Sequence, residues 1–530
     1  MVKLVSILTI IIKKLKLMKI FGTVFLTILF ATFQLKAQDA AGLQLLNYEK
    51  FNDASLVFAK NAENVSIFYQ GYSLMRAGKI GMANTIFSKI ATTPLGIVGA
   101  GWVELNKNNA AGAKILFENA LKASKNKDGL VYRFIGEAYT ESVGVKDYAQ
   151  AIEKLKAANN LIKNNAAISI ALGEAYLAAQ DGGNAVVQFE YAAKYDPSTA
   201  LPNCKIGSVY YLSRNYPLAI EYLNKAIAID SKNPVIYREL GKIYYKQKKY
   251  DLAKEQFSKY ATIGEMDVED KTLYANILFL GKDYPAAIEI INEIIKTDNS
   301  KNYLNRLIGY SYYETEKYLD AQIFMEKFFA TQPKEKIIAS DYEYYGKSLM
   351  KNGKDSIGIL NFIKAAEMDT TNKEPWGSVA EAYFKLKKYN EAAIYYTKKI
   401  DSDAPSASDW FNVGNSYYRA KNFIQAKAAF YKVVEIKPEA ATGHLWCSKA
   451  LLGMDPEQKT SSAKPFYEKY IEIASLNPEK NKRDLVDAYN YMSADAYNNK
   501  GDIPLAKEFA QKVLSLDPSN EQAKSVMSIK

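Results

Sequence analysis

The chain has 530 residues, a formal net charge of +11 and a hydrophobic fraction of 48%. The first 37 residues contain six lysines and no acid, so the rest of the chain carries a net charge of only +5. Such a weak charge, spread over the remaining chain, argues against a nucleic-acid-binding protein. The single histidine excludes zinc sites of the His-Glu-x-x-His type, which need two histidines.

The N-terminal segment contains two apolar runs, residues 4–12 and 20–33. The second run is about 14 residues long, whereas a membrane-spanning helix needs about 20 apolar residues. A short apolar run between a basic residue and a small residue is typical of a secretory signal peptide. We therefore predict that residues 1–37 are a signal peptide, with Met18 as an alternative start, and that the protein is exported to the periplasm or the outer membrane. An inner-membrane anchor formed by residues 20–33 and a cytosolic protein are the alternatives.

The remainder, residues 38–530, repeats one pattern that is clearest in residues 407–440. Counted from Ala407 as position 1, the characteristic positions 4, 8, 11, 20, 24 and 32 are Trp410, Gly414, Tyr417, Ala426, Phe430 and Pro438. The first three of these positions lie on one face of a helix, and positions 20 and 24 lie on one face of a second helix. One such pair buries too little surface to fold alone, so the pattern predicts a stack of pairs.

In chain order, we expect about 14 units, starting at residues 35, 64, 94, 129, 166, 200, 234, 268, 302, 339, 373, 407, 441 and 487. The first unit is truncated, as expected of a terminal cap. Three extra residues are expected to lengthen the inter-helix turn near residues 143–146. Polar insertions, which normally form loops, are expected at residues 454–460 and 478–484.

This pattern resembles the tetratricopeptide repeat (TPR) family. The resemblance implies an all-α fold, a solenoid of antiparallel helix pairs wound into a right-handed superhelix. It also implies that the first helices line a concave groove, with positions 2, 5, 9, 12 and 13 facing it. The residues themselves offer no catalytic constellation, no glycine-rich phosphate-binding loop and no calcium loop. We therefore expect no enzyme activity, no catalytic residue and no bound cofactor or metal.

Position 12 carries an aromatic ring in most units from residue 200 to residue 440, with cations nearby at positions 5, 9 and 13. The predicted partner-binding groove consists of Tyr211, Arg238, Lys242, Tyr245, Lys246, Phe279, Arg306, Tyr313, Phe384, Asn415, Tyr418 and Arg419. Rings beside cations suit an extended peptide, held by apolar contact and by charge-assisted hydrogen bonds. The alternative is that these aromatic residues serve packing alone. The carboxylate clamp of the family is not supported, because position 5 is Phe411 where Asn415 occupies position 9.

Three single residues have simpler interpretations. His444 falls at position 4 of its unit, where an aromatic ring packs, so we expect a packing role. Cys204 and Cys447 lie in units that are not neighbours. A solenoid keeps such units apart, so a disulfide bond between them is not expected.

The sequence therefore predicts a non-enzymatic scaffold of the bacterial cell envelope that binds partner proteins or extended peptides. The alternative function is an envelope TPR protein that binds or guides an exported polysaccharide. Exposed tryptophans would favour that alternative, but only four exist, and Trp376 and Trp410 occupy packing position 4.

Overall fold

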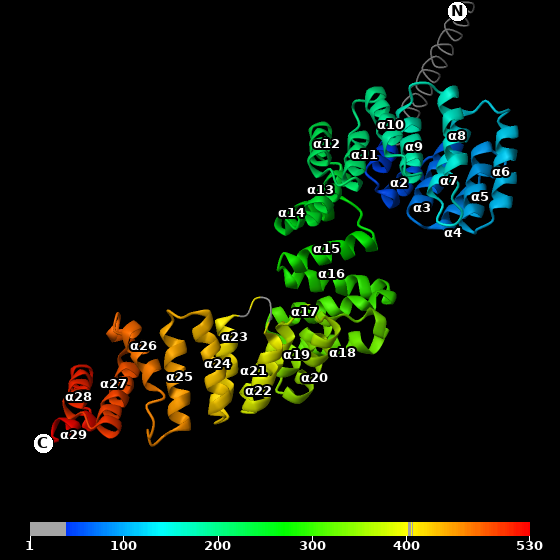
Figure 1. The fold of residues 1–530 in the computed structure, drawn as a ribbon. Coiled ribbons are helices and arrows are strands. Elements are labelled where there is room, and N and C mark those ends of the chain that lie inside the picture. The colour runs from blue at the N-terminus through cyan, green and yellow to red at the C-terminus, as the bar shows by residue number, and fades with distance from the viewer. Residues whose placement is uncertain (1–38, 401–403, 405) are drawn as a thin grey trace, which may run out of the picture. The chain divides into compact units, whose positions relative to one another are not determined.

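The computed structural model describes residues 39–400, 404 and 406–530. Every regular element within these ranges is a helix (Figure 1). The predicted signal peptide, and with it the alternative anchor at residues 20–33, lies outside the described residues. Among the helices that are described, none is both long and apolar enough to cross a membrane.

The first helix is described from residue 39 to residue 47. The helices that follow are α2 (Phe51–Phe58), α3 (Asn64–Arg76), α4 (Ile80–Ser88), α5 (Pro94–Asn106), α6 (Ala110–Ala123), α7 (Gly129–Glu141), α8 (Tyr148–Leu161), α9 (Ala166–Ala178), α10 (Gly182–Tyr195), α11 (Leu201–Leu212), α12 (Tyr216–Ile229), α13 (Pro234–Lys246), α14 (Tyr250–Ile263), α15 (Val268–Leu280) and α16 (Tyr284–Thr297). The rest are η1 (Asn299–Leu304), α17 (Asn305–Glu314), α18 (Tyr318–Thr331), η2 (Lys334–Lys336), α19 (Ala339–Lys351), α20 (Asp355–Met368), α21 (Glu374–Lys385), α22 (Tyr389–Lys399), α23 (Ala407–Arg419), α24 (Phe423–Ile436), α25 (Ala441–Met454), α26 (Lys464–Ala474), α27 (Pro478–Lys500), α28 (Ile503–Leu516) and α29 (Glu521–Met527). This succession of about 14 pairs confirms the predicted all-α solenoid.

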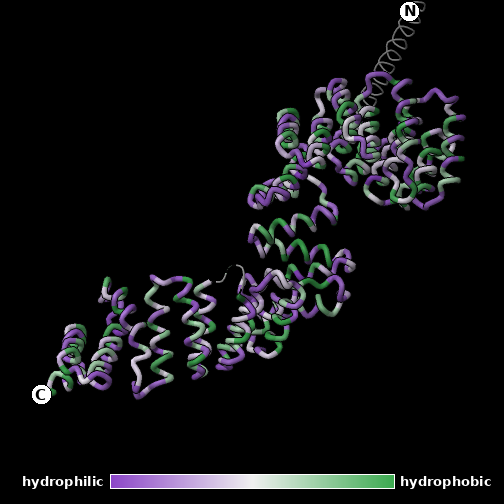
Figure 2. Tube along the Cα trace, in the orientation of Figure 1, coloured by the Kyte–Doolittle hydropathy of each residue, from purple (hydrophilic) through white to green (hydrophobic). Residues whose placement is uncertain are grey.

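The chain divides into two compact units, Met1–Ala286 and Ala287–Lys530, with the boundary in the first turn of α16. Within each unit, a helix pair packs against the next pair along the chain, as α8 does against α9 and α22 against α23. Apolar and polar residues are interspersed along the helices of both units, as expected of helices with one buried face (Figure 2).

Each pair is held together by a ring that fills the space left by a small residue. Phe430 of α24 is fully buried, and a Cβ atom added to Gly414 of α23 would lie 2.6 Å from its ring. Ala426, one turn before Phe430, is also fully buried. The two helices can therefore approach closely, which explains why the spacing between positions 8, 20 and 24 recurs among the repeats of this chain.

Two of the predicted insertions are loops and the third is not. Residues 143–146 lie in the loop between α7 and α8, and most of residues 454–460 lie in the loop between α25 and α26, as predicted. The prediction for residues 478–484 is wrong, because these residues form the first turns of α27. Pro478 starts this helix without losing a hydrogen bond, and Asn477 caps it by accepting from the Lys480 amide at 3.4 Å.

Candidate binding cavity in the first unit

The first helix pair of the chain contacts the sixth and seventh pairs. The Tyr48 hydroxyl donates to Asp230 at 2.6 Å, across 182 positions of sequence. The carboxylate of Glu265 accepts from the Asn52 amide at 3.2 Å and from the Asp53 amide at 3.1 Å. The first seven helix pairs, which end with α14 in Figure 1, therefore close into a single turn.

This closed turn encloses two adjoining cavities of about 570 and 310 Å³. Their walls come mainly from the first helices of successive pairs: α3, α7, α9 and α11 all contribute side chains. Arg76, Glu174 and Lys205 line both cavities, so charged groups separate one space from the other.

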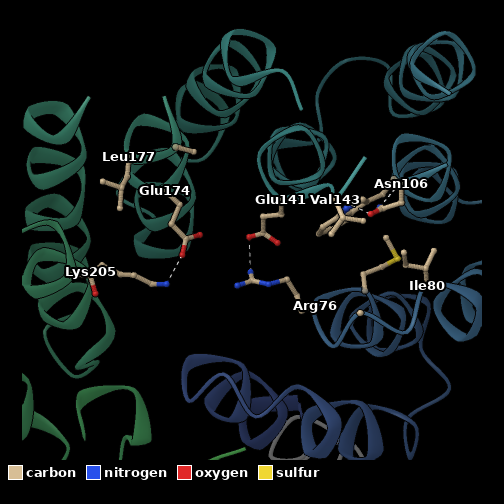
Figure 3. Close-up of a pocket in the computed structure, with 13 residues that line it drawn as sticks. Arg76, Ile80, Asn106, Glu141, Val143, Glu174, Leu177 and Lys205 are labelled. Carbon is tan, nitrogen blue, oxygen red and sulfur yellow. Dashed lines mark hydrogen bonds and ion pairs between the residues drawn. The ribbon is translucent and has the colours of Figure 1, made fainter. Parts of the chain in front are cut away.

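Two contacts between a basic and an acidic group lie side by side at the larger cavity (Figure 3). Arg76 Nη1 is 2.6 Å from Glu141 Oε1, and Lys205 Nζ is 2.7 Å from Glu174 Oε1. Lys205 also contacts Glu49, which precedes α2, at 3.2 Å. All five side chains are less than a quarter exposed, so these charges interact in a medium less polar than bulk water.

The network continues along the inside of the turn. Arg238 donates to Glu49 at 2.7 Å and to Glu239 at 3.0 Å. Lys242 contacts Glu239 at 3.2 Å. Around the smaller cavity, Arg133 Nε lies 2.6 Å from Glu137 Oε1. We name this group the inner charge network: Glu49, Arg76, Arg133, Glu137, Glu141, Glu174, Lys205, Arg238, Glu239 and Lys242.

Burial and neighbouring charges shift the pKa values of the acids in this network. Burial, the largest influence, raises the pKa of Glu141 to about 8. The carboxylates of Glu174 and Glu137 add to this rise, whereas Arg76 and Lys205 oppose it. Glu141 therefore retains a proton near neutral pH, at a carboxyl group that lines the larger cavity.

Two carboxyl oxygens of the network lack a hydrogen-bond partner among the described residues. They are Glu137 Oε2 and Glu141 Oε2, and both atoms are buried. The Glu137 side chain is only 4% exposed and lines the smaller cavity. Buried polar atoms in folded proteins nearly always have a partner. Glu137 Oε2, and Glu141 Oε2 when its carboxyl group is ionised, can therefore each accept a further hydrogen bond.

The loop between α7 and α8 forms part of the rim of the larger cavity. The Val143 amide donates to Asn106 Oδ1 at 3.0 Å, and the Val145 amide donates to the Leu105 carbonyl at 3.0 Å. Gly144, between them, lies so close to the Leu105 carbonyl that a Cβ atom would collide with it. The loop is thus pinned to α5, which leaves the Val143 side chain at the rim and 76% exposed.

The predicted groove residues are spread over both units, and each of their aromatic rings makes the same kind of contact within its own helix pair. Each position-12 ring packs against a ring at the start of the second helix of the same pair: Tyr211 on Tyr216, Tyr245 on Tyr250, Phe279 on Tyr284, Tyr313 on Tyr318, Phe384 on Tyr389 and Tyr418 on Phe423, at 5.2 to 6.3 Å between centroids. The recurrence of aromatic residues at both positions could have indicated this pairing from the sequence. The position-12 rings are half-buried, so one part of each still faces solvent.

Most of the predicted groove cations have partners within the chain. Arg238 and Lys242 belong to the inner charge network. Arg306 donates to Asp341 at 2.8 Å, and the Arg419 guanidinium lies 5.5 Å from the centroid of the Phe384 ring. Lys246 is exposed and Asn415 is half-buried. Their role towards a partner remains a prediction.

The remaining single residues are buried. His444 is 7% exposed, and its Nε2 lies 2.8 Å from the Pro438 carbonyl oxygen. Both cysteines are free and buried. Burial raises the pKa of the Cys447 thiol to about 12 and that of Cys204 further still, so neither is a reactive thiolate.

Comparisons with known proteins place these repeats in a family. The family described as "TPR repeat" matches residues 214–248, and that described as "Tetratricopeptide repeat" matches residues 410–439 and 488–520. The crystal structure of the C-terminal part of a TPR repeat-containing protein from Cytophaga hutchinsonii is 32% identical, covers 49% of this chain and 100% of that chain, and has a TM-score of 0.42. The chain belongs to the tetratricopeptide repeat family.

Two further solved structures are similar at lower identity. A tetratricopeptide repeat protein from Parabacteroides merdae is 19% identical, with 48% of this chain and 93% of that chain covered and a TM-score of 0.30. YrrB, described as a TPR protein with an unusual peptide-binding site, is 18% identical, with 38% and 99% covered and a TM-score of 0.32. No curated protein matches the sequence.

Proposed function

We propose that this protein is a non-enzymatic scaffold of the bacterial cell envelope, which binds partner proteins or extended peptides on the faces formed by its first helices. The observation that carries the proposal is the stack of TPR pairs, because TPR proteins generally bind other proteins or peptides. Half-buried rings recur on these helices and offer apolar contact to a partner.

Export is part of the proposal and rests on the N-terminal sequence. Residues 1–37 combine six lysines, no acid and a short apolar run before Ala37. That combination favours a signal peptide and a location in the periplasm or at the outer membrane. The partners are then proteins of the same compartment.

The test is co-purification from the envelope of the native host after mild crosslinking, with mass spectrometry of the captured proteins and of the N-terminus. We expect a mature N-terminus at Gln38 and a defined set of envelope proteins. An intact N-terminus with cytosolic partners would contradict the envelope location, and a chain that captures no partner would contradict the scaffold function.

Charge reversal at Arg419, an exposed residue at the end of α23, tests the binding face. We expect Arg419→Glu to reduce capture of at least one partner several-fold, the effect of removing one charged contact. The matched control is Lys432→Glu on α24, whose side chain is 51% exposed and pairs with Glu435 of the same helix. Equal loss with both variants would show that overall charge, rather than this face, controls capture.

A further inference from the structure

We propose that the cavity of the first unit binds an alkylammonium or guanidinium group, supplied by a lysine or arginine side chain of a peptide partner. The inference rests on the proposed function, because it takes the partner to be a peptide. It adds the chemistry that the cavity recognises, which neither the repeats nor the comparisons specify.

The first argument is the kind of atom that lacks a partner. In the described part of the first unit, the buried side-chain atoms without a hydrogen bond are all oxygens: Glu137 Oε2, Glu141 Oε2 and Gln247 Oε1. Two of the three belong to carboxyl groups that line the cavities. Once Glu141 is ionised, both carboxyl oxygens only accept hydrogen bonds, so an occupant that satisfies them must donate. A carboxylate binds a charged donor more strongly than a neutral one.

The second argument is the charge balance. The inner charge network contains five acids and five bases, and one acid, Glu141, retains its proton near neutral pH. A cation that displaces this proton leaves the net charge of the buried network unchanged. With this proton in place the network carries one positive charge more than negative charges. An anion would balance that charge, but at Glu141 it would lie against the carboxylates of Glu174 and Glu137, whose negative charges raise the pKa of Glu141.

The charged and titratable groups that influence Glu141 come from four first helices. They are Arg76 and Tyr72 of α3, Glu137 of its own helix α7, Glu174 of α9 and Lys205 of α11. Figure 3 shows the Glu141 and Glu174 carboxyl groups directed towards each other from neighbouring helices. A single ammonium group between them could therefore contact both.

The third argument is the shape and lining of the larger cavity. Its volume of about 570 Å³ lies within the range of pockets that bind small molecules or side chains. Met75, Ile80, Trp102 and Leu177 supply apolar surface next to the charged groups. Long basic side chains combine an apolar stem with a charged end, and this lining matches both parts.

The experiment is calorimetric titration of the full-length protein with three probes. They are the peptide acetyl-Gly-Gly-Lys-Gly-Gly-amide, the same peptide with Nε-acetyl-lysine, and n-butylammonium chloride. We expect the lysine peptide to bind about tenfold more tightly than the acetyl-lysine peptide, the effect of one charge-assisted hydrogen bond. Binding at neutral pH should also release a proton, measured as a difference in heat between two buffers, and it should strengthen as the pH rises towards 8, the pKa of Glu141.

Two variants separate recognition from folding. Glu141→Gln keeps the shape and can still accept from Arg76, so we expect it to abolish the preference for lysine and the proton release. Ala178→Phe fills the cavity from the end of α9 without changing any charge, and it should weaken binding of all three probes. The control is Glu255→Gln on α14, a residue 53% exposed and outside the network, which should change nothing. Thermal melts followed by circular dichroism confirm that each variant is folded.

Three results would each overturn the inference. The two peptides could bind equally tightly, the preference for lysine could survive Glu141→Gln, or no probe could bind at concentrations up to roughly 10 mM. Binding of n-butylammonium alone, abolished by Glu141→Gln, would support the cation site and identify a free amine as its ligand. Envelope partners that still co-purify with Glu141→Gln would leave the scaffold function intact even where the cavity inference fails.

Discussion

Glu49 is the residue on which closure of the first unit most depends. It lies between the first helix and α2, and it bonds to Arg238 of α13 and Lys205 of α11. Burial is the largest influence on its pKa and would raise it, but the charges of Arg238, Lys205 and Arg76 together hold the pKa well below 4.5. The ionised form of Glu49 therefore stabilises the closed turn.

Replacing Glu49 with glutamine should destabilise the first unit by about 2 kcal/mol, because Arg238 and Lys205 lose a buried counter-charge. Trp102 is the one tryptophan in the sequence of this unit, so its fluorescence reports urea unfolding there once the other three tryptophans are phenylalanine. The control is Glu221→Gln, which removes an exposed pair with Lys225 and should cost less than about 0.5 kcal/mol. An equal loss in both variants would contradict a special role for Glu49.

The stabilisation by Glu49 should depend on pH, and a comparison of wild type with Glu49→Gln measures this dependence. Because folding lowers the pKa of Glu49, its stabilising contribution is complete above 4.5, the unfolded value, and is lost as the pH falls below it. The difference in unfolding free energy between wild type and Glu49→Gln should therefore be constant near neutral pH and shrink in acid. A difference that grows in acid, or that does not change with pH, would show that another group controls closure.

At the scale of the element, the helix pair depends on a ring packed against a residue without a side chain. Gly414→Val would drive a side chain into the Phe430 ring, which would lie 2.6 Å from the new Cβ atom, and should cost about 1 to 3 kcal/mol. Gly81→Ala in α4 is the control, because nothing lies within 4 Å of its Cβ position. It should be neutral or stabilise by up to about 1 kcal/mol, as measured by urea unfolding. If Gly414→Val did not lower the free energy of unfolding, close packing of Gly414 against Phe430 would not be needed to hold the helix pair together.

The elements that the sequence predicted best are those whose packing is local. A glycine at position 8 and a ring at position 24 meet within about 16 residues, as Gly414 and Phe430 do, so their spacing alone indicates the contact. The contact between Tyr48 and Asp230 spans 182 positions and has no periodic signal, so the closed turn and its charge network could not be predicted. The Lys242 prediction found a member of the network without its partner, Glu239, because acidic residues on a helix usually face solvent.

At the scale of the whole molecule, the central claim is that the first seven helix pairs close on themselves. The ion pairs of Glu49 with Lys205 and Arg238, and the cavities that α3 and α11 line together, exist only in the closed turn. Each pair interacts mainly with its neighbours, so closure needs the additional contacts made by residues 47–53. The binding chemistry that we propose therefore depends on the integrity of this one junction.

The most direct test is crosslinking of cysteines placed across the junction. Asn52 and Glu265 are in contact, with the Asn52 Nδ2 atom 3.0 Å from Glu265 Oε2, and the native cysteines are buried and do not compete. We expect Asn52→Cys with Glu265→Cys to crosslink rapidly with a short bismaleimide. Asn52→Cys with Glu118→Cys on α6 should remain unlinked, because α2 packs mainly against α3 and α6 packs mainly against α5. Failure of the first pair to crosslink, or equal crosslinking of both pairs, would contradict the closed turn.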